Sequence, residues 1–179
     1  MAAPGWRGRA AVVYLAGAVA GALLSASLLG LAGGLLRGAH GDRPWLTVPA
    51  FAAVAGMAWL RQLRPGLVWL PENRRQVTQA VLGRGPVHGA AQFGFEMGTG
   101  VRTFMTSASP YLLASWLVLF ATPWALLVSA LGFALGRGLP NLLYLRYGDR
   151  AAAPVPAVAR ASDVVASVGL AAVVAVTVL

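Results

Sequence analysis

The feature that most constrains this chain is an apolar run from Ala10 to Leu36, twenty-seven residues without a charged side chain. At about 1.5 Å per helical residue, such a run exceeds the roughly 30 Å hydrocarbon core of a bilayer. Arg7 and Arg9 precede the run, and Arg37 ends it. A signal peptide also begins with basic residues, but its apolar core has only about 7–15 residues. The run therefore predicts a retained membrane-spanning helix, with a cleaved signal peptide as the alternative.

The composition favours the same class of protein over the whole chain. Hydrophobic residues make up 58% of the sequence and charged residues 11%, with a mean hydropathy of +0.70. Soluble domains carry about 25% charged residues, so a large soluble core is not expected. The sequence predicts an all-α fold, a polytopic transmembrane helical bundle that forms one integral membrane domain over residues 1–179.

Further apolar segments follow the first, separated by short stretches that contain arginine and proline. We place the five spans at about residues 10–36, 45–60, 88–121, 124–145 and 157–179, with a basic cytoplasmic loop at 61–87. Four or six spans are the alternatives. The third segment is too long for one straight helix, and Gly98, Gly100 and Pro110 are where we expect it to kink or break.

The second segment is the shortest, and several segments contain glycine pairs four residues apart. With sixteen residues, segment 45–60 would need long arginine side chains or local bilayer thinning. The spacings Gly17-x-x-x-Gly21 and Gly30-x-x-x-Gly34 allow helices to pack closely, and Gly132-x-x-x-Gly136 has the same form.

The arginines predict an orientation in the membrane. Ten of the fourteen lie before the first span, in the 61–87 loop, or between residues 146 and 160. Positive residues of short loops concentrate on the cytoplasmic side. We therefore expect a multi-pass protein of the cell (inner) membrane with its amino terminus in the cytoplasm and its carboxyl terminus outside.

Charge and residue types exclude several functions. A net charge of +9 would suggest nucleic acid in a soluble protein. Here the arginines lie between apolar runs, so we expect the lipid bilayer as the partner and no nucleic acid. The chain has no cysteine, which removes thiol catalysis and thiolate metal sites. His40 and His88 lie far apart, each beside a segment end, so we expect no metal and no cofactor.

A polar stripe within the third segment is the main candidate for a functional site. Its members recur at intervals of three and four residues, which places them on one side of a helix. The stripe contains Gln92, Glu96, Thr99, Thr103, Thr106 and Pro110, and Arg102 and Ser107 lie beside it.

Two interpretations of this stripe remain open. Hydroxyl groups in membrane helices commonly bond to their own backbone or to a neighbouring helix, at about 0.6 kcal/mol per interhelical bond. Alternatively, a broken helix exposes polar groups to a water-filled groove for a solute or an ion. Glu96 lies either in the headgroup region or in that groove. In a regular helix Glu96 and Arg102 point about 120° apart, so a direct ion pair requires the helix to open near Gly98 and Gly100.

A second candidate cluster lies late in the fourth segment and contains Arg137, Pro140 and Asn141. Pro140 would release backbone carbonyl groups one turn earlier, and Arg137 or Asn141 could bond to them. The alternative is that Arg137 extends to the membrane interface.

The run Gly94-Phe-Glu-Met-Gly-Thr-Gly-Val-Arg-Thr-Phe-Met-Thr-Ser-Ala-Ser-Pro110 resembles a segment of the CcdA/DsbD transmembrane electron-transfer family. Gly136-Arg-Gly-Leu-Pro140 looks like a later glycine-to-proline segment of that family, so the resemblance covers residues 83–143. It implies the family's fold, a bundle of six spans with a helix broken at proline. It does not imply the activity, because that family shuttles electrons through membrane cysteines and a hydroxyl cannot perform thiol–disulfide exchange. The chain is also similar to small membrane proteins of high-GC bacteria.

These observations predict a non-enzymatic, transporter-like membrane protein whose polar groove along the third segment binds or conducts a small solute or ion. The alternatives are a scaffold or accessory subunit of a membrane complex, with a membrane-protein partner or a homo-oligomer, and a cysteine-less relative of the thiol electron-transfer proteins. A membrane-embedded enzyme has little support, since the chain has no H-E-x-x-H spacing and no convincing nucleophile–base pair.

Overall fold

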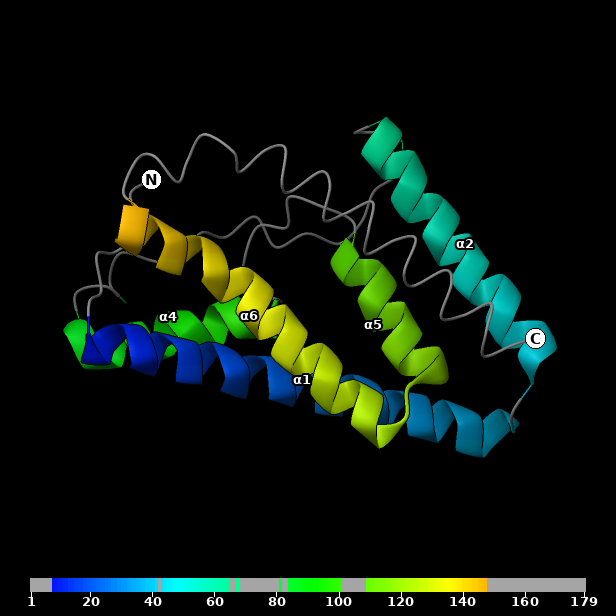
Figure 1. Ribbon diagram of the computed structural model, residues 1–179. Helices are drawn as coiled ribbons and strands as arrows, with labels where there is room; N and C mark the ends of the chain where they lie inside the picture. Colours follow the sequence, from blue (N-terminus) through cyan, green and yellow to red (C-terminus); the bar gives the residue numbers. More distant parts are fainter. Residues whose placement is uncertain are drawn as a thin grey trace. The chain divides into compact units, whose positions relative to one another are not determined.

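The computed structural model describes residues 8–41, 43–64, 67, 81, 84–100 and 109–147. These residues form helices joined by turns, and no strand occurs among them (Figure 1). The all-α prediction is confirmed for this part of the chain. The predicted fifth span, 157–179, and most of the basic loop lie outside the described residues.

The helices follow the first four predicted segments. Their bounds are α1 Arg9–His40, α2 Pro44–Leu63, α4 Pro86–Thr99, α5 Ser109–Phe120 and α6 Pro123–Tyr147. The chain divides into two compact units. The first unit contains residues 1–26, 72–104 and 127–156, and the second contains residues 27–71, 105–126 and 157–179. Helices α1 and α6 therefore contribute residues to both units.

The predicted third segment, 88–121, is two helices in the structure. Helix α4 ends at Thr99, and Gly100 takes the left-handed conformation with φ 68°. Glycine adopts this conformation without steric cost and commonly ends a helix there. Pro110 does not kink a helix, because it is the second residue of α5, where its missing N–H group is not needed. Of the predicted break points, Gly100 ends a helix and Pro110 lies at the start of the next.

Helix α2 is longer than predicted. It contains 20 residues, begins at Pro44 and continues through Pro49 to Leu63. Its first turn tolerates Pro44 because the first N–H groups of a helix have no partner within the helix. The apolar part of the helix, Trp45–Arg61, is nevertheless short for a membrane span, as predicted.

Within the described residues, one helix is both long and apolar enough to cross a membrane. This helix is α1, over Arg9–Ala39. A signal sequence near the amino terminus and the core helix of a soluble protein also meet this criterion of length and apolarity. The structure thus supports one candidate span, and the multi-pass arrangement stays a prediction.

In the first unit, the core lies along small residues of α1. Ala10 and Tyr14 are buried with Ala90 of α4, and the rings of Tyr14 and Phe93 lie 5.9 Å apart between centroids. Farther along α1, Ala18 is fully buried. These α1 residues recur every fourth position, so they form one face of the helix.

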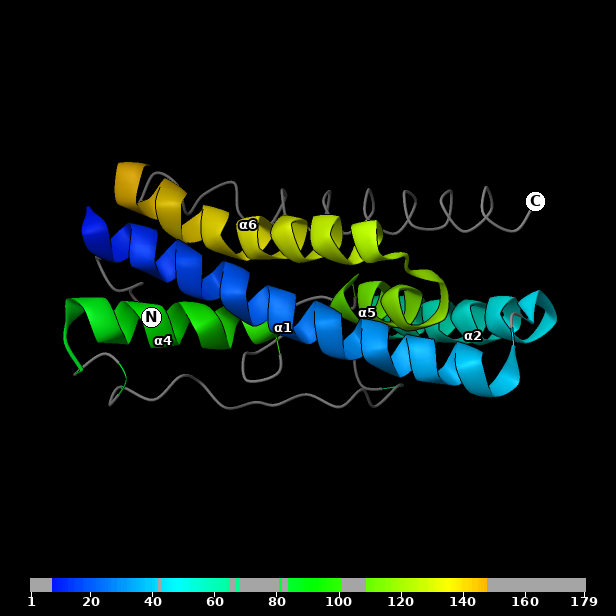
Figure 2. The same cartoon turned by 90° about the horizontal axis from the view of Figure 1, so that it is seen from below.

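Two glycines of α4 lie directly on the backbone of α1. A Cβ atom on Gly94 would overlap the carbonyl oxygen of Tyr14, and one on Gly98 would overlap that of Ala18. Each pair is four residues apart, in the same order along both helices. Helix α4 therefore runs parallel to the beginning of α1, and the two lie side by side in Figures 1 and 2.

Helix α1 makes the same contact in return. A Cβ atom on Gly17 would overlap the carbonyl oxygen of Ala91, and one on Gly21 would overlap that of Phe95. At such contacts the Cα–H groups of glycine can donate weak hydrogen bonds, worth about 0.5–1 kcal/mol each. The packing role predicted for Gly17 and Gly21 is confirmed. Their partners, Gly94 and Gly98, were not predicted as a packing motif.

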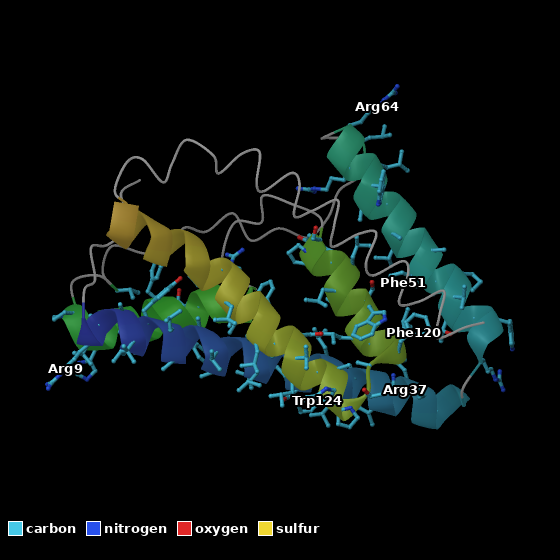
Figure 3. The ribbon with its side chains drawn as sticks, in the orientation of Figure 1. Arg9, Arg37, Phe51, Arg64, Phe120 and Trp124 are labelled. Carbon is cyan, nitrogen blue, oxygen red and sulfur yellow. The ribbon has the colours of Figure 1, made fainter. Side chains whose placement is uncertain are left out.

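In the second unit, α2 packs against α5. The rings of Phe51 and Phe120 meet edge to face with centroids 5.8 Å apart, and Ala58 is buried with Leu112. Since the position in α2 rises as the position in α5 falls, these helices are antiparallel. Figure 3 shows Phe51 and Phe120 between them.

The later part of α1 also contacts α5 in the second unit. A Cβ atom on Gly33 would overlap the carbonyl oxygen of Val118. One turn later, the Arg37 guanidinium donates hydrogen bonds to the carbonyl oxygens of Val118 at 3.0 Å and Ala121 at 3.5 Å. Carbonyl groups at the end of a helix have no partner within it, and a cation there is favourable for the helix dipole. Arg37 therefore caps α5.

Candidate functional site

The beginning of the predicted polar stripe forms a chain of hydrogen bonds in the first unit. The exposed Arg84 donates from Nη1 to Gln92 Oε1 at 2.7 Å. Gln92 donates in turn from Nε2 to Glu96 Oε1 at 3.0 Å. Glu96 is 9% exposed and is the buried charged residue of the described core. A buried carboxylate is thus connected through one amide to a surface guanidinium.

The polar side chains of α4 lie along one side of the helix. His88, Gln92, Glu96 and Thr99 follow one another at intervals of four, four and three residues. At about 100° per residue, Gln92 and Glu96 point roughly 120–160° away from the glycine face that contacts α1. The polar face and the packing face of α4 are therefore different surfaces.

The hydroxyl groups at the end of α4 bond to backbone carbonyls. Thr99 Oγ1 donates to the Glu96 carbonyl oxygen at 2.9 Å, within the same helix. Ser25 Oγ of α1 donates to the Thr99 carbonyl oxygen at 3.0 Å. Ser25 thereby satisfies a terminal carbonyl that α4 cannot pair itself. For Thr99, the bonding of a hydroxyl to its own backbone is the arrangement observed.

Arg137 lies among side chains of three helices in the first unit. Its Nη2 atom is 3.7 Å from Met97 Sδ of α4, and its guanidinium carbon is 5.8 Å from the centroid of the Phe133 ring. The phenol of Tyr14, in α1, is an electrostatic neighbour. Gly138 leaves room here, because a Cβ atom at this position would lie 2.8 Å from Leu15. The contacts of Arg137 thus include a thioether, an aromatic ring and a phenol.

The structure describes some predicted site residues and not others. Gln92 and Glu96 are hydrogen-bonded to each other, and Thr99 lies one turn beyond them. Pro110 is the second residue of α5, which belongs to the other unit. Arg102, Thr103, Thr106 and Ser107 lie outside the described residues. Helix α6 continues through Pro140 and Asn141, whose side chains are not described.

Several residues around these sites were not predicted from the sequence. The sequence places Arg84 in a basic loop and Arg37 at the end of an apolar run, but it does not indicate their hydrogen-bond partners. The spacing Gly94-x-x-x-Gly98 was present in the sequence as a signal for packing. Ser25 had no such signal, because a single serine in an apolar helix is common.

Comparison of the chain with protein-family models, with curated proteins and with solved structures finds no match.

Proposed function

We propose that the protein is a multi-pass protein of the cell (inner) membrane. Two features of its surface support this location. Of the most apolar 18-residue window of α1, 28% is buried inside the molecule, whereas the core helix of a soluble protein is mostly buried. Large apolar side chains are also exposed near helix ends, with Trp45 at 68%, Trp59 at 50% and Trp124 at 71%. In water such a surface would favour aggregation, and tryptophan is typical of the membrane interface.

The proposed orientation keeps the amino terminus in the cytoplasm. In this arrangement α1 leaves the cytoplasm, α2 returns, and the chain that follows the basic loop leaves again. Helices α1 and α4 would then point the same way, which agrees with the parallel contact of their backbones. The predicted fifth span, 157–179, would complete the bundle.

Within this framework we infer that the polar face of α4 lines a groove that binds or conducts a small solute or ion. The single observation that carries this inference is the hydrogen-bond chain from the exposed Arg84 through Gln92 to the buried Glu96. An ionisable residue inside a membrane costs at least about 2.5–3.5 kcal/mol, so a site that retains one has a use for it. Helix α4 also ends at Gly100, and interrupted helices commonly form the binding sites of membrane transporters.

The proposed activity is non-enzymatic and needs no cofactor. No group of three or more histidine, cysteine or acidic residues with metal-binding geometry occurs in the described part of the chain. The proposal that the protein is not an enzyme rests on the sequence, which has no cysteine and no convincing nucleophile–base spacing.

A flux measurement tests the groove. Purified protein is reconstituted into vesicles loaded with a pH-sensitive dye, and proton entry is measured under an imposed potassium diffusion potential. The same vesicles are tested with radioactive sodium. We expect Glu96→Gln and Thr103→Val to reduce the flux, whereas Ser115→Ala should retain it. Ser115 is a suitable control because its hydroxyl bonds to the Leu112 carbonyl oxygen of its own helix in the other unit. If both stripe variants match the parent in flux and in growth of the host cell, the groove is rejected.

A second candidate function is a scaffold or accessory subunit. The observation that favours it is an open face of α6, where a Cβ atom on Gly132 or Gly136 would meet nothing within 4 Å. Such glycines accept close contact with another helix. Purification in mild detergent separates the two functions, since a stoichiometric membrane-protein partner favours the scaffold and solute flux by the isolated protein favours the groove.

The resemblance to the CcdA/DsbD family remains a proposal about fold alone. A cysteine-less relative would retain the broken helix and lose electron transfer, because no residue of this chain can exchange a disulfide.

A further inference from the structure

Three basic side chains gather at one end of the first unit. Helices α1 and α4 are parallel, and Ala10 is buried with Ala90, so both helices begin at this end. Arg9 is the first residue of α1, Arg84 lies just before α4, and His88 lies in its first turn. All three are exposed, and Figure 3 shows Arg9 directed away from the helices. We call Arg9, Arg84 and His88 the basic end.

Among the described residues, no acidic side chain forms a salt bridge with Arg9, Arg84 or His88. Neither α1 nor α4 has an acidic residue in its first turn. In the described part of the chain, Arg84 is linked to one acid, Glu96, through the Gln92 side chain. Among the described residues, Arg84 uses one guanidinium nitrogen, Nη1, for this chain. The Arg84 side chain is exposed, and a planar guanidinium matches phosphate oxygens well.

Apolar surface borders these charges directly. Val12 follows Arg9 by one helical turn and is 67% exposed, and Val87, next to His88, is 49% exposed. A partner that covers this region must therefore offer anionic groups beside an apolar phase. A bilayer offers phosphate groups above acyl chains, whereas nucleic acid and acidic protein surfaces offer the charge without the apolar phase.

We propose that the basic end binds the phosphate groups of anionic phospholipids, an inference that rests on the membrane location proposed above. Arg9 and Arg84 hold the headgroup phosphates, while Val12 and Val87 contact the upper acyl chains. Because Arg84 also holds Gln92, a bound headgroup orders the outer end of the polar face of α4. Anionic lipid thereby acts on the same hydrogen-bond chain that reaches Glu96.

Native mass spectrometry of the full chain tests this proposal. The protein is released from neutral detergent micelles that contain phosphatidylglycerol or phosphatidylcholine in graded amounts. We expect phosphatidylglycerol to bind more tightly, and raising the salt concentration to reduce the difference. An arginine near an anionic membrane surface contributes about fivefold in affinity, so Arg9→Gln with Arg84→Gln should weaken phosphatidylglycerol binding by about 25-fold.

The matched control is Arg43→Gln. Arg43 is also an exposed arginine next to the start of a helix, but it lies in the second unit. We expect this variant to bind phosphatidylglycerol as the parent does. Circular dichroism establishes that each variant keeps its helices. The comparison of the two lipids uses the parent protein alone, so it holds even if a variant fails to fold.

Three results would overturn the proposal: equal affinity for the two lipids, equal loss in Arg43→Gln and the double variant, or preference for a soluble polyanion such as heparin over phosphatidylglycerol. Vesicle flotation separates this failure from failure of the proposed function. A parent protein that does not float with vesicles contradicts the membrane location itself. If the parent protein floats and its flux depends on Glu96, but its lipid binding does not depend on lipid charge, only the lipid site is contradicted.

Discussion

The two units of this protein use the same helix, α1, in different ways. In the first unit, α1 and α4 meet through four glycines, each placed on a carbonyl group of the other helix. In the second unit, α1 contacts α5 through one glycine, Gly33, and then through the guanidinium of Arg37. The beginning of α1 thus packs closely against the backbone of α4, whereas its later part caps the end of α5.

This difference determines which kind of substitution each unit resists. The glycine contact has no spare volume, so an added methyl group must separate the backbones. The contacts of the second unit depend on large or long side chains, namely Phe51, Phe120 and Arg37. The first unit should therefore be most sensitive to added atoms and the second to removed atoms.

The largest effect is expected from Gly94→Ala combined with Gly98→Ala. Each new Cβ atom would overlap a carbonyl oxygen of α1, and overpacking costs about 1–3 kcal/mol at each site. Unfolding of the purified protein in mixed micelles, followed by tryptophan fluorescence, measures the loss of stability.

The control for this prediction is Gly132→Ala combined with Gly136→Ala. These glycines have open space around the missing Cβ atom, so alanine should be neutral or should stabilise the helix by up to about 1 kcal/mol per site. If both double variants lose the same stability, the close approach of α1 and α4 is not the cause.

The next largest effect is expected in the second unit from Arg37→Gln. The variant loses charged hydrogen bonds to the carbonyl groups of Val118 and Ala121, and such bonds contribute about 1.5–3 kcal/mol. The same unfolding measurement applies. Arg43→Gln is the control, because Arg43 is exposed and should lose less than about 0.5 kcal/mol. A loss of that small size in Arg37→Gln would mean that water caps α5 equally well.

A smaller effect is expected from Phe51→Leu. The variant keeps an apolar side chain but loses the edge-to-face contact with Phe120, and such pairs contribute about 0.5–1.5 kcal/mol. A double-mutant cycle with Phe120→Leu isolates this interaction. Additive losses in the two single variants would show that the rings do not stabilise the contact between α2 and α5.

The smallest effect is expected in the first unit from Ser25→Ala. The variant loses the hydrogen bond to the Thr99 carbonyl oxygen, and interhelical hydrogen bonds in membranes average about 0.6 kcal/mol. Hydrogen exchange at the end of α4 should increase in this variant, while exchange in α2 should stay as in the parent. Unchanged exchange at both helices would remove Ser25 as the cap of α4.

The sequence predicted the helices well because their signals are local. The apolar run after Arg9 predicted α1, and the apolar segment 124–145 predicted α6, which begins at Pro123. Gly100 was among the predicted break points, and the structure ends α4 there in a left-handed conformation that glycine takes easily. The predicted break in the third segment is confirmed at Gly100, but apolar periodicity alone did not indicate which of the predicted break points the chain uses.

The candidate site was predicted only in part. The spacing of Gln92 and Glu96 is a local property of a helix, so their hydrogen bond follows from the sequence pattern. The contacts of Arg137 with Met97 and Phe133 did not follow in the same way. Phe133 is one turn away on the same helix, but Met97 lies 40 residues earlier, and no local pattern connects it to Arg137.

The sequence by itself determined that this chain is apolar, helical and interrupted within its third segment, because residue type and spacing act within a few turns of a helix. Only the tertiary structure decided that Gly94 and Gly98 meet α1 whereas Gly132 and Gly136 meet nothing, although both pairs have the same spacing. It also decided that Ser25 caps a carbonyl group 74 residues later in the chain. Whether a glycine packs against another helix depends on which helix lies beside it, and the whole fold determines that.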